Sequence, residues 1–260
     1  MDNSLIHTTD ALVLCILLFI AMITMVALGK IAGKIWRREE GEPKGGVNSL
    51  LAALFALFGF ILAFTFGMSG SRYENVRNVT VEEANNIGTA VLRADLYSDS
   101  VRDAFRMDFK KYLEARIDYY NNVKDTVLFT KAKADAAKAA DALWARAMQQ
   151  SKLANMLIPS NQMIPALNAM FDIATTREVI LKARVPDMIV WMLFILALTI
   201  SFIGGFTSSS IRHKDWIIVA GFALLSSMII YITLDLGRPM RGIIKAEMGQ
   251  QAILDLRKMF

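Results

Sequence analysis

The chain has 260 residues and a formal net charge of +5; 55% of its residues are hydrophobic and only 20% are charged. Soluble proteins usually have about 45–50% apolar and about 25% charged residues, so the composition excludes an ordinary soluble enzyme and favours an integral membrane protein. The basic residues are dispersed, which argues against nucleic-acid binding. The single cysteine, Cys15, excludes an internal disulfide and is expected to be a small buried residue.

Four runs of the sequence contain no Asp, Glu, Lys or Arg, and each is long enough to cross a bilayer. A membrane-spanning helix needs roughly 17–25 mostly apolar residues. The N-terminus lacks the basic segment that precedes the apolar core of a cleavable signal peptide, so the first run is expected to remain as a span. The four expected spans are Ala11–Gly29, Gly45–Ser71, Met188–Ile211 and Trp216–Leu234.

The segment between the second and third spans, Arg72–Val185, is expected to fold as an antiparallel helical bundle outside the bilayer. Strand signals are absent, and the scarcity of proline and glycine favours long helices. The sequence Thr80-Val-Glu-Glu83 matches a capping box, which predicts a helix start there. A second start is predicted at Ser98, after which apolar residues recur at helical spacing over Val101–Tyr120.

Two further helices complete the expected bundle. A segment rich in Ala, Lys and Asp, Asp125–Leu157, is predicted to be helical and to end at Pro159. Pro165 is expected in the first turn of the next helix, where proline is tolerated, and this helix would run to Arg184. The predicted fold is therefore all-α, a four-span transmembrane protein with a helical insert. The expected divisions are residues 1–71 with spans one and two, 72–185 with the insert, 186–236 with spans three and four, and 237–260 as an amphipathic C-terminal tail.

The charges near the span ends favour neither orientation of the protein in the membrane strongly. Lys and Arg residues close to the span ends are divided almost equally between the two sides of the membrane. No basic residue precedes the first span, whereas several follow it directly. By the positive-inside rule this difference favours short loops inside the cell and the insert outside.

Small residues share one face of the second span and are candidates to line a pore. They recur at spacings of four, three and four residues, which places them on one side of a helix. Pores can be lined by small or apolar side chains, although packing against a neighbouring helix explains the same pattern. The candidate pore-lining residues are Ala52, Ala56, Gly59 and Ala63.

Glycines at five positions are expected to mark close approaches between helices, because small residues let transmembrane backbones meet. The spans contain no ionisable residue, which argues against a proton-driven pump but not against a channel. The five glycines are Gly59, Gly67, Gly70, Gly204 and Gly205.

The densest polar stretch follows the second span, and a smaller one follows the fourth. If the spans are antiparallel, both stretches end on the same side and could meet at a pore mouth or a subunit contact. A solvated helix with paired charges explains the first stretch equally well. The candidate pore-mouth or polar-layer residues are Arg72, Glu74, Asn75, Arg77, Glu82, Glu83, Asn86, Arg93 and Asp95, with Asp235 and Arg238 after the fourth span.

The sequence gives little support for a metal site or an enzyme active site. The carboxylates of Glu82, Glu83 and Asp95 suit a hard cation, but no loop with fixed ligand spacing accompanies them, so no metal and no cofactor are predicted. The two histidines, His7 and His213, are far apart in the sequence, and no set of residues typical of nucleophilic or acid–base catalysis is present. The chain is therefore not expected to be an enzyme.

Two signatures resemble a known family. The first runs from Phe66-Gly-Met-Ser-Gly-Ser-Arg-Tyr-Glu-Asn through Glu82-Glu-Ala-Asn-Asn-Ile-Gly-Thr-Ala to Leu92-Arg-Ala-Asp95, and the second is Leu234-Asp-Leu-Gly-Arg-Pro-Met-Arg-Gly242. Together they are similar to those of the bestrophin-like domain proteins, a family of bacterial membrane proteins of unknown function. The chain departs from that pattern at Gly237, where the family often has an acidic residue, and after Asp95, where it often has an apolar residue and a proline.

The resemblance implies a relation to bestrophins, which are pentameric anion channels with four spans and a cytoplasmic insert. It therefore predicts an oligomeric ion channel, most plausibly for anions, in the bacterial inner membrane, and it favours the cytoplasm for the insert. The alternative is a membrane sensor or scaffold subunit that signals through its helical insert. The expected partners are the lipid bilayer, further copies of the chain and small ions.

Overall fold

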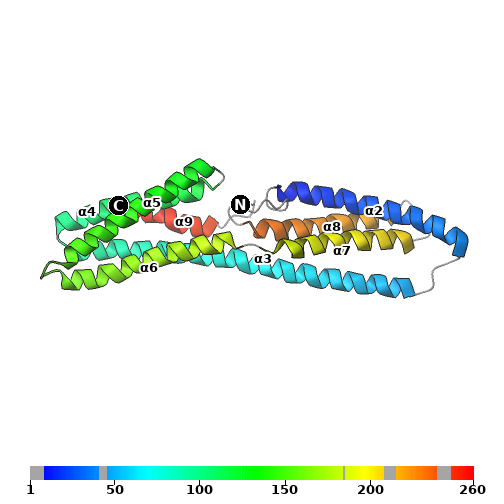
Figure 1. The fold of residues 1–260 in the computed structure, drawn as a ribbon, viewed down its shortest axis with the longest axis horizontal. Coiled ribbons are helices and arrows are strands. Elements are labelled where there is room, and N and C mark those ends of the chain that lie inside the picture. The colour runs from blue at the N-terminus through cyan, green and yellow to red at the C-terminus, as the bar shows by residue number, and fades with distance from the viewer. Residues whose placement is uncertain (1–8, 41–45, 124, 184, 208–214, 239–246) are drawn as a thin grey trace. The chain divides into compact units, whose positions relative to one another are not determined.

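The computed structural model describes residues 9–40, 46–123, 125–183, 185–207, 215–238 and 247–260. Within these ranges all regular elements are helices, as the sequence predicts. The chain divides into two compact units (Figure 1), which are described separately. Unit 1 comprises Met1–Arg72 and Arg184–Gly237, and unit 2 comprises Tyr73–Ala183 and Arg238–Phe260.

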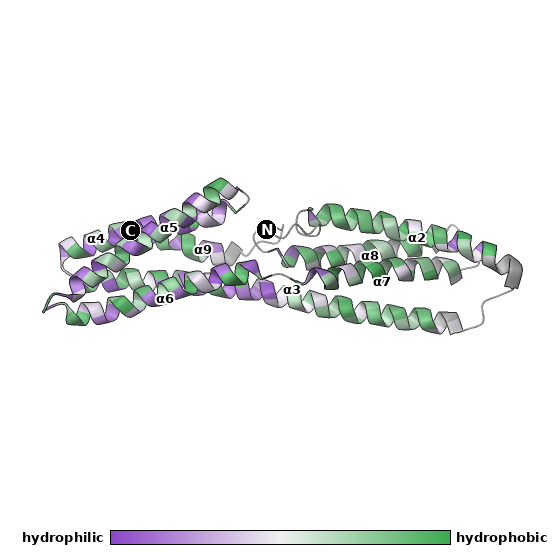
Figure 2. Ribbon diagram, viewed as in Figure 1, coloured by the Kyte–Doolittle hydropathy of each residue, from purple (hydrophilic) through white to green (hydrophobic). Residues whose placement is uncertain are grey.

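Unit 1 contains the apolar helices. They are α2 (Ala11–Glu40), the first part of α3 (Gly46–Arg93), α7 (Asp187–Thr207) and α8 (Asp215–Leu236). Figure 2 shows these helices as almost entirely hydrophobic. In the part of the chain that the structure describes, four stretches are long and apolar enough to cross a membrane. The predicted number of spans is therefore confirmed, although α2 continues as a helix beyond the predicted end of its span.

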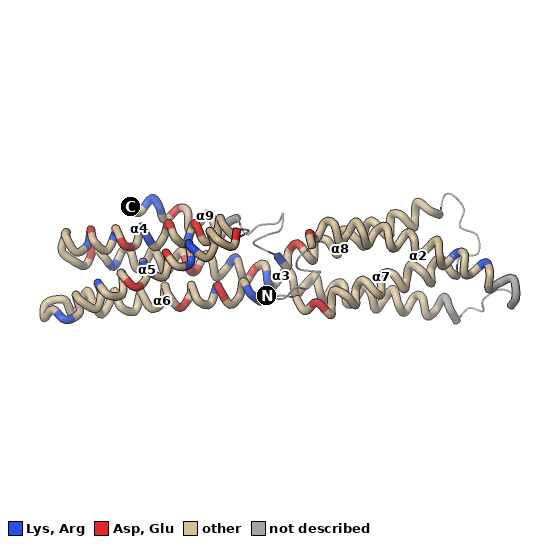
Figure 3. The backbone as a smooth tube through the Cα atoms, turned by 45° about the horizontal axis from the view of Figure 1, so that its top comes forward, with Lys and Arg blue, Asp and Glu red and all other residues tan. Residues whose placement is uncertain are grey.

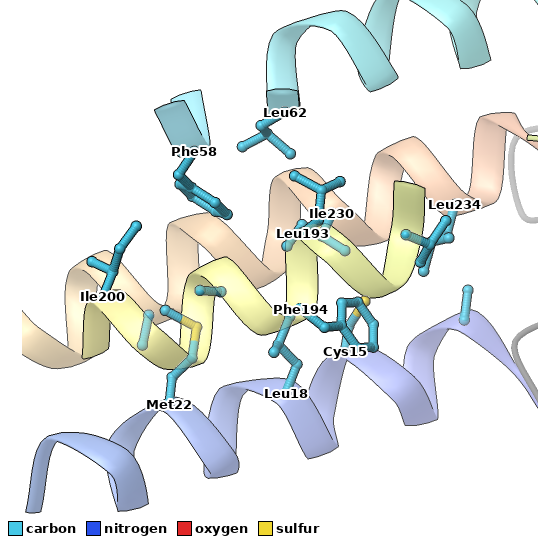
Figure 4. Packing of buried hydrophobic residues seen from close by; sticks show 14 residues of the cluster. Cys15, Leu18, Met22, Phe58, Leu62, Leu193, Phe194, Ile200, Ile230 and Leu234 are labelled. Atoms are coloured by element: carbon cyan, nitrogen blue, oxygen red, sulfur yellow. The ribbon is translucent and has the colours of Figure 1, made fainter. Parts of the chain in front are cut away.

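The core of unit 1 joins all four of these helices. Helix α2 packs most extensively on α7 and next on α8. Figure 4 shows Met22 of α2, Phe194 of α7 and Phe58 of α3 in this core, together with residues of α8. Cys15 is also part of it and is buried, as the sequence predicts. Tight apolar packing of this kind holds helices together where the surrounding lipid is itself apolar.

The contact between α2 and α7 depends on glycine. At Gly29 and Gly33 of α2 and at Gly205 of α7, an added Cβ would lie closer than 3.0 Å to backbone atoms of the facing helix. Real Cβ atoms essentially never come so close, so only glycine fits at these three positions. The two backbones therefore touch along a seam without intervening side chains, which we call the glycine seam.

Of the five glycines predicted to mark close approaches, only Gly205 lies at one. The Cβ positions of the other four, Gly59, Gly67, Gly70 and Gly204, have no neighbour within 4 Å among the described residues. The sequence analysis missed Gly29 and Gly33, although their spacing of four residues is the small-xxx-small pattern of packed transmembrane helices. The predicted first span ends at Gly29, so this pattern extends beyond it.

Unit 2 is a bundle of amphipathic helices. Figure 3 shows that charged residues are concentrated here and are scarce along α7 and α8. The apolar faces meet in a core that includes Phe105, Phe109, Leu143 and Leu167. The elements are the second part of α3, η1 (Ala94–Leu96), α4 (Asp99–Asn121), α5 (Thr126–Ser151), α6 (Leu157–Lys182), α9 (Glu247–Asp255) and η2 (Leu256–Met259).

The predicted helix start at Thr80 is wrong, whereas the one at Ser98 is confirmed. Helix α3 runs without interruption through Thr80, whose hydroxyl donates to the carbonyl oxygen of Val76 at 2.7 Å, one turn back. A threonine that bonds to the preceding turn is satisfied inside a helix and does not need to cap one. Ser98 is the N-cap of α4 with extended backbone angles, although its side chain makes no capping hydrogen bond.

The predicted break between α5 and α6 also lies elsewhere. Helix α5 ends at Ser151, and α6 begins at Leu157, so Pro159 lies in the first turn of α6 instead of ending the preceding helix. Proline is tolerated there because the first turn has no backbone acceptor to bond with. Pro165 lies inside α6 and not at its start; the buried side chain of Leu167, close by on the same helix, is one of the core contacts that hold this stretch helical.

The C-terminal helix α9 and the following turn η2 pack against unit 2. A Cβ at Gly249 would lie 2.9 Å from the side chain of Thr80, so α9 approaches α3 closely. Ile253 is fully buried in a cluster with Leu113 of α4. Arg257 donates two hydrogen bonds to the carboxylate of Glu114, at 2.9 and 2.5 Å, on the exposed side.

We expect Ile253→Ala to release α9 from the bundle. Truncating a fully buried isoleucine costs about 2–5 kcal/mol, and Ile253 is the one apolar side chain of α9 that is fully buried among its described residues. Hydrogen exchange in α9 should rise by more than a hundredfold, measured by mass spectrometry. Arg257→Ala is the control, because it removes only a solvent-exposed ion pair and should change exchange little. If Arg257→Ala were the more severe change, charge and not burial would hold α9 in place.

Candidate functional site

The exposed face of α3 in unit 1 carries the candidate pore-lining residues. Ala52, Ala56, Gly59 and Ala63 are all exposed in the single chain. A helix turns roughly 100° per residue, so this face lies about a third of a turn away from the side of α3 that buries Phe58 and Leu62. The structure therefore leaves the small-residue face of α3 available to a pore, to lipid or to another copy of the chain.

Two phenylalanines extend this exposed surface. Phe60 is 70% exposed and Phe64 is 59% exposed, and both lie beside the small-residue face. The sequence analysis did not single them out, because a phenylalanine in an apolar span is normally a core or lipid-facing residue. Their spacing of four residues, which is the spacing of Ala52 and Ala56, was the available signal.

The ends of the second and fourth spans meet within unit 1. The Cβ position of Gly237, just after α8, lies 3.8 Å from the hydroxyl oxygen of Ser69 on α3. Asp235 is buried there, and Arg72 is half-buried at the end of this part of α3. This adjacency is the one that an antiparallel arrangement of spans predicts.

The polar residues that follow on α3 divide between surface and interior of unit 2. Glu74 forms an exposed ion pair with Arg77 at 3.2 Å, one turn along the same helix, and Asn75 and Glu82 are also exposed. Arg238, which follows the fourth span, belongs to unit 2 and is half-buried. Paired charges along an exposed helix were one of the two interpretations that the sequence allowed, and for Glu74 and Arg77 the structure has that arrangement.

Glu83 lies in the interior of unit 2 between two arginines. Its carboxylate accepts a hydrogen bond at 2.5 Å from Nε of Arg116 on α4 and a second from Nη1 of Arg177 on α6. Glu83 and Arg177 are both fully buried, with 0% of their surface exposed. A single carboxylate thus links α3 to α4 and to α6, and the buried cluster holds one more positive than negative charge.

Aromatic rings enclose this cluster. The guanidinium carbon of Arg177 lies 3.1 Å from the ring centroid of Tyr120, and the hydroxyls of Tyr120 and Thr80 are hydrogen-bonded at 3.1 Å. Burial raises the pKa of Tyr112, also nearby, to about 12. Burial alone would lower the pKa of Arg116, but the charge of Glu83, the hydrogen bond to its carboxylate and the nearby tyrosines together outweigh burial and raise this pKa. The carboxylate of this cluster is already bonded to both arginines, which suits holding helices together rather than reacting with a substrate.

The remaining candidates do not converge on one site. The side chain of Asn86 donates to the carbonyl oxygen of Ala169 at 3.3 Å, and Asp95 accepts from Arg106 at 2.9 Å. Arg93 is half-buried at the end of α3. Among the described residues, no group of three or more His, Cys, Asp or Glu side chains could hold a metal ion.

The sequence analysis did not identify Arg116 or Arg177, although their positions carried a signal. Arg116 follows Phe109 by seven residues and therefore lies on the apolar face of α4. Arg177 lies seven residues after Met170, on the buried face of α6. An arginine at an apolar position of a helix points to a buried partner, because an unpaired buried charge is too costly.

A sequence model of the bestrophin-like domain matches residues 13–248. The chain belongs to the bestrophin-like domain family. The match covers the described helices α2 to α8, so family membership extends across both units of this bestrophin-like protein. The resemblance suggested by the two sequence signatures is thereby confirmed.

The bestrophin-like chain also has the fold of solved membrane proteins. It is similar to three crystal structures of a bacterial bestrophin homolog from Klebsiella pneumoniae, two of them of mutants. The TM-scores are 0.69, 0.68 and 0.68 at 12%, 12% and 11% identity. The matches cover 94–96% of this chain and 98–99% of the other. At this identity the similarity shows a common fold. No curated protein matches the sequence.

Proposed function

We propose that this protein is an oligomeric ion channel of the bacterial inner membrane whose pore is lined by α3. The observation that carries the proposal is the exposed face of α3, where small residues are turned away from the core on an otherwise bulky transmembrane helix. Family membership and the shared fold support it, because bestrophins are ion channels. Several copies of α3 around an axis would bring these small residues together, as closed rings of subunits do.

The ion is proposed to be an anion. Arg72 lies at the end of the apolar part of α3, where a ring of subunits would place several positive charges near one mouth of the pore. The sequence also carries more basic than acidic residues. The insert is proposed to lie in the cytoplasm, because membership of the bestrophin-like family outweighs the nearly balanced count of charges.

Cysteine modification of α3 tests the pore assignment. Cys15 is the only natural cysteine, so Cys15→Ala gives a cysteine-free chain. In this background, Ala56→Cys should react with a charged thiosulfonate and change the current in planar bilayers severalfold. Leu57→Cys is the matched control, since it is also exposed but is turned away by roughly 100°. Equal effects at both positions would show that the small-residue face does not line the pore.

Ion selectivity and assembly test the rest of the proposal. The purified protein should form a ring-shaped oligomer and conduct chloride in preference to potassium. In Arg72→Ala the reversal potential of the current should shift toward the equilibrium potential of potassium. A monomer or dimer without current would contradict a channel and favour a sensor or scaffold subunit. A cysteine at the exposed position Asp135 of unit 2 should be labelled only from the cytoplasm, and labelling from outside would reverse the orientation.

A further inference from the structure

Unit 1 contains an apolar cavity that the channel proposal does not use. Its volume is about 340 Å³, and residues of α2, α3, α7 and α8 line it. Among the described residues, none lies within 4 Å of the Cβ position of Gly204, one of the lining residues, so space remains beside this glycine. Phe55 and Ile218, which also line the cavity, are themselves exposed, and the cavity therefore reaches the surface of the unit.

The residues that line the cavity favour an apolar ligand. Of the described residues that line the cavity, only Ser201 has a polar side chain, and its hydroxyl already donates to the carbonyl oxygen of Ala197 at 2.8 Å. A polar ligand or a hydrated ion would lose its water here and gain no hydrogen bond, which costs several kcal/mol. A hydrocarbon chain gives up no hydration or hydrogen bond by entering such a space.

The cavity lies toward one end of the spans. Gly204 is three residues before the end of α7, and Phe222 is seven residues after the start of α8, which is about 10 Å along a helix. The hydrocarbon core of a bilayer is about 30 Å thick. This depth therefore corresponds to the upper acyl-chain region of the leaflet that faces the two short loops.

Positive charge lies beyond the cavity on the same helix. Val26 of α2 lines it, and Lys30 and Lys34 follow by one and two turns, about 6 and 12 Å further along the axis. Lys34 is exposed. Basic residues at the edge of a span attract anionic lipid headgroups. The apolar cavity lies at the depth of lipid acyl chains, and the lysines lie at the depth of lipid headgroups. Together they match the acyl chain and the headgroup of one anionic phospholipid.

We propose that this cavity binds the acyl chain of an anionic phospholipid from the surrounding bilayer, with its phosphate held near Lys34. The bound acyl chain would occupy the cavity that α2, α3, α7 and α8 of unit 1 line. It does not depend on ion conduction, and its failure would leave the channel proposal untouched.

A lipid titration with two matched glycine variants tests the proposal. Gly204→Leu adds a side chain at the cavity wall, where an added Cβ meets no described residue within 4 Å. Gly221→Leu makes the same change on α8, at a position whose Cβ also meets no described residue within 4 Å but which does not line the cavity. Native mass spectrometry of the purified oligomer would measure binding of phosphatidylglycerol and of phosphatidylcholine with identical chains. Gly204→Leu should weaken the tightest binding of both lipids roughly tenfold, a change that corresponds to about 1.4 kcal/mol, and Gly221→Leu should not.

The headgroup part of the proposal has its own variant. Lys34→Gln should reduce the preference for phosphatidylglycerol over phosphatidylcholine severalfold and leave phosphatidylcholine binding unchanged. Unaltered lipid binding in Gly204→Leu would overturn the proposal, and an accompanying change in oligomeric state would assign the cavity to a contact with a second copy of the chain. Gly204→Ala, a smaller change with an intermediate expected effect, keeps the test decisive if the leucine variant is poorly produced.

Discussion

Replacing Glu83 with glutamine should lower the free energy of unfolding by roughly 3–5 kcal/mol, because the change leaves two arginines buried together without a counter-charge. Glu83 is the only carboxylate to which both Arg116 and Arg177 are hydrogen-bonded in the described structure. Thermal unfolding in detergent, followed by hydrogen exchange in α4 and α6, would measure the loss. The exchange data assign the effect to unit 2.

Two comparisons separate charge from packing in this prediction. Glu82→Gln is the matched control, since Glu82 is the neighbouring residue but is exposed, and it should change stability little. Arg177→Met should cost less than Glu83→Gln, because it leaves a balanced pair of Glu83 and Arg116. It also removes two nitrogen atoms, Nε and Nη2 of Arg177, that have no hydrogen-bond partner among the described residues. If Arg177→Met were the more damaging change, the arginine would matter through its contact with Tyr120 and not through charge balance.

Gly205→Leu should abolish the folded state of unit 1. The Cβ of any other residue at this position would overlap the backbone of α2 at Val26, and a backbone cannot rotate away as a side chain can. The two helices would have to separate along the glycine seam, at a cost of about 4 kcal/mol or more, which is in the range that removes most folded protein. The yield of monodisperse protein in size-exclusion chromatography is the measurement.

The adjacent residue supplies the control. Gly204→Leu makes the same substitution one position earlier, where the added Cβ has no neighbour within 4 Å in the part of the chain that the structure describes. Its yield and melting temperature should remain close to those of the parent protein. Similar losses in the two variants would mean that helix propensity or insertion into the membrane, and not the contact with α2, decides the outcome.

The spans and the helical class of unit 2 could be predicted from the sequence because they depend on local patterns. Charge-free runs of sufficient length define the spans, and Ser98 marks the start of α4 through its position before an apolar periodicity. Thr80 and Pro159 misled the analysis because each has two physical roles. A threonine can cap a helix or bond to the preceding turn, and a proline can end a helix or occupy its first turn. Only the tertiary contacts of the segment decide between them.

The candidate site was less accessible to sequence reasoning. Helical spacing grouped Ala52 with Ala56, but exposure of that face depends on which side of α3 meets the core, and the pattern of small residues alone does not determine this. Glu83 was grouped with its polar neighbours in the sequence, although the buried residues Val79 and Ile87 lie four positions before and after it on the same face of α3. Its true surroundings come from Arg116 and Arg177, which are remote in sequence.

The glycine seam has a consequence for how the protein is made. Gly29 and Gly33 belong to the first span and Gly205 to the third, and the whole insert is synthesised between them. At about 5–20 residues per second, α2 stays in the membrane for roughly ten to thirty-five seconds before α7 is available. During that interval its bare backbone face can pair with the same face of another nascent chain. The final packing of α2 can therefore form only after α7 has entered the membrane.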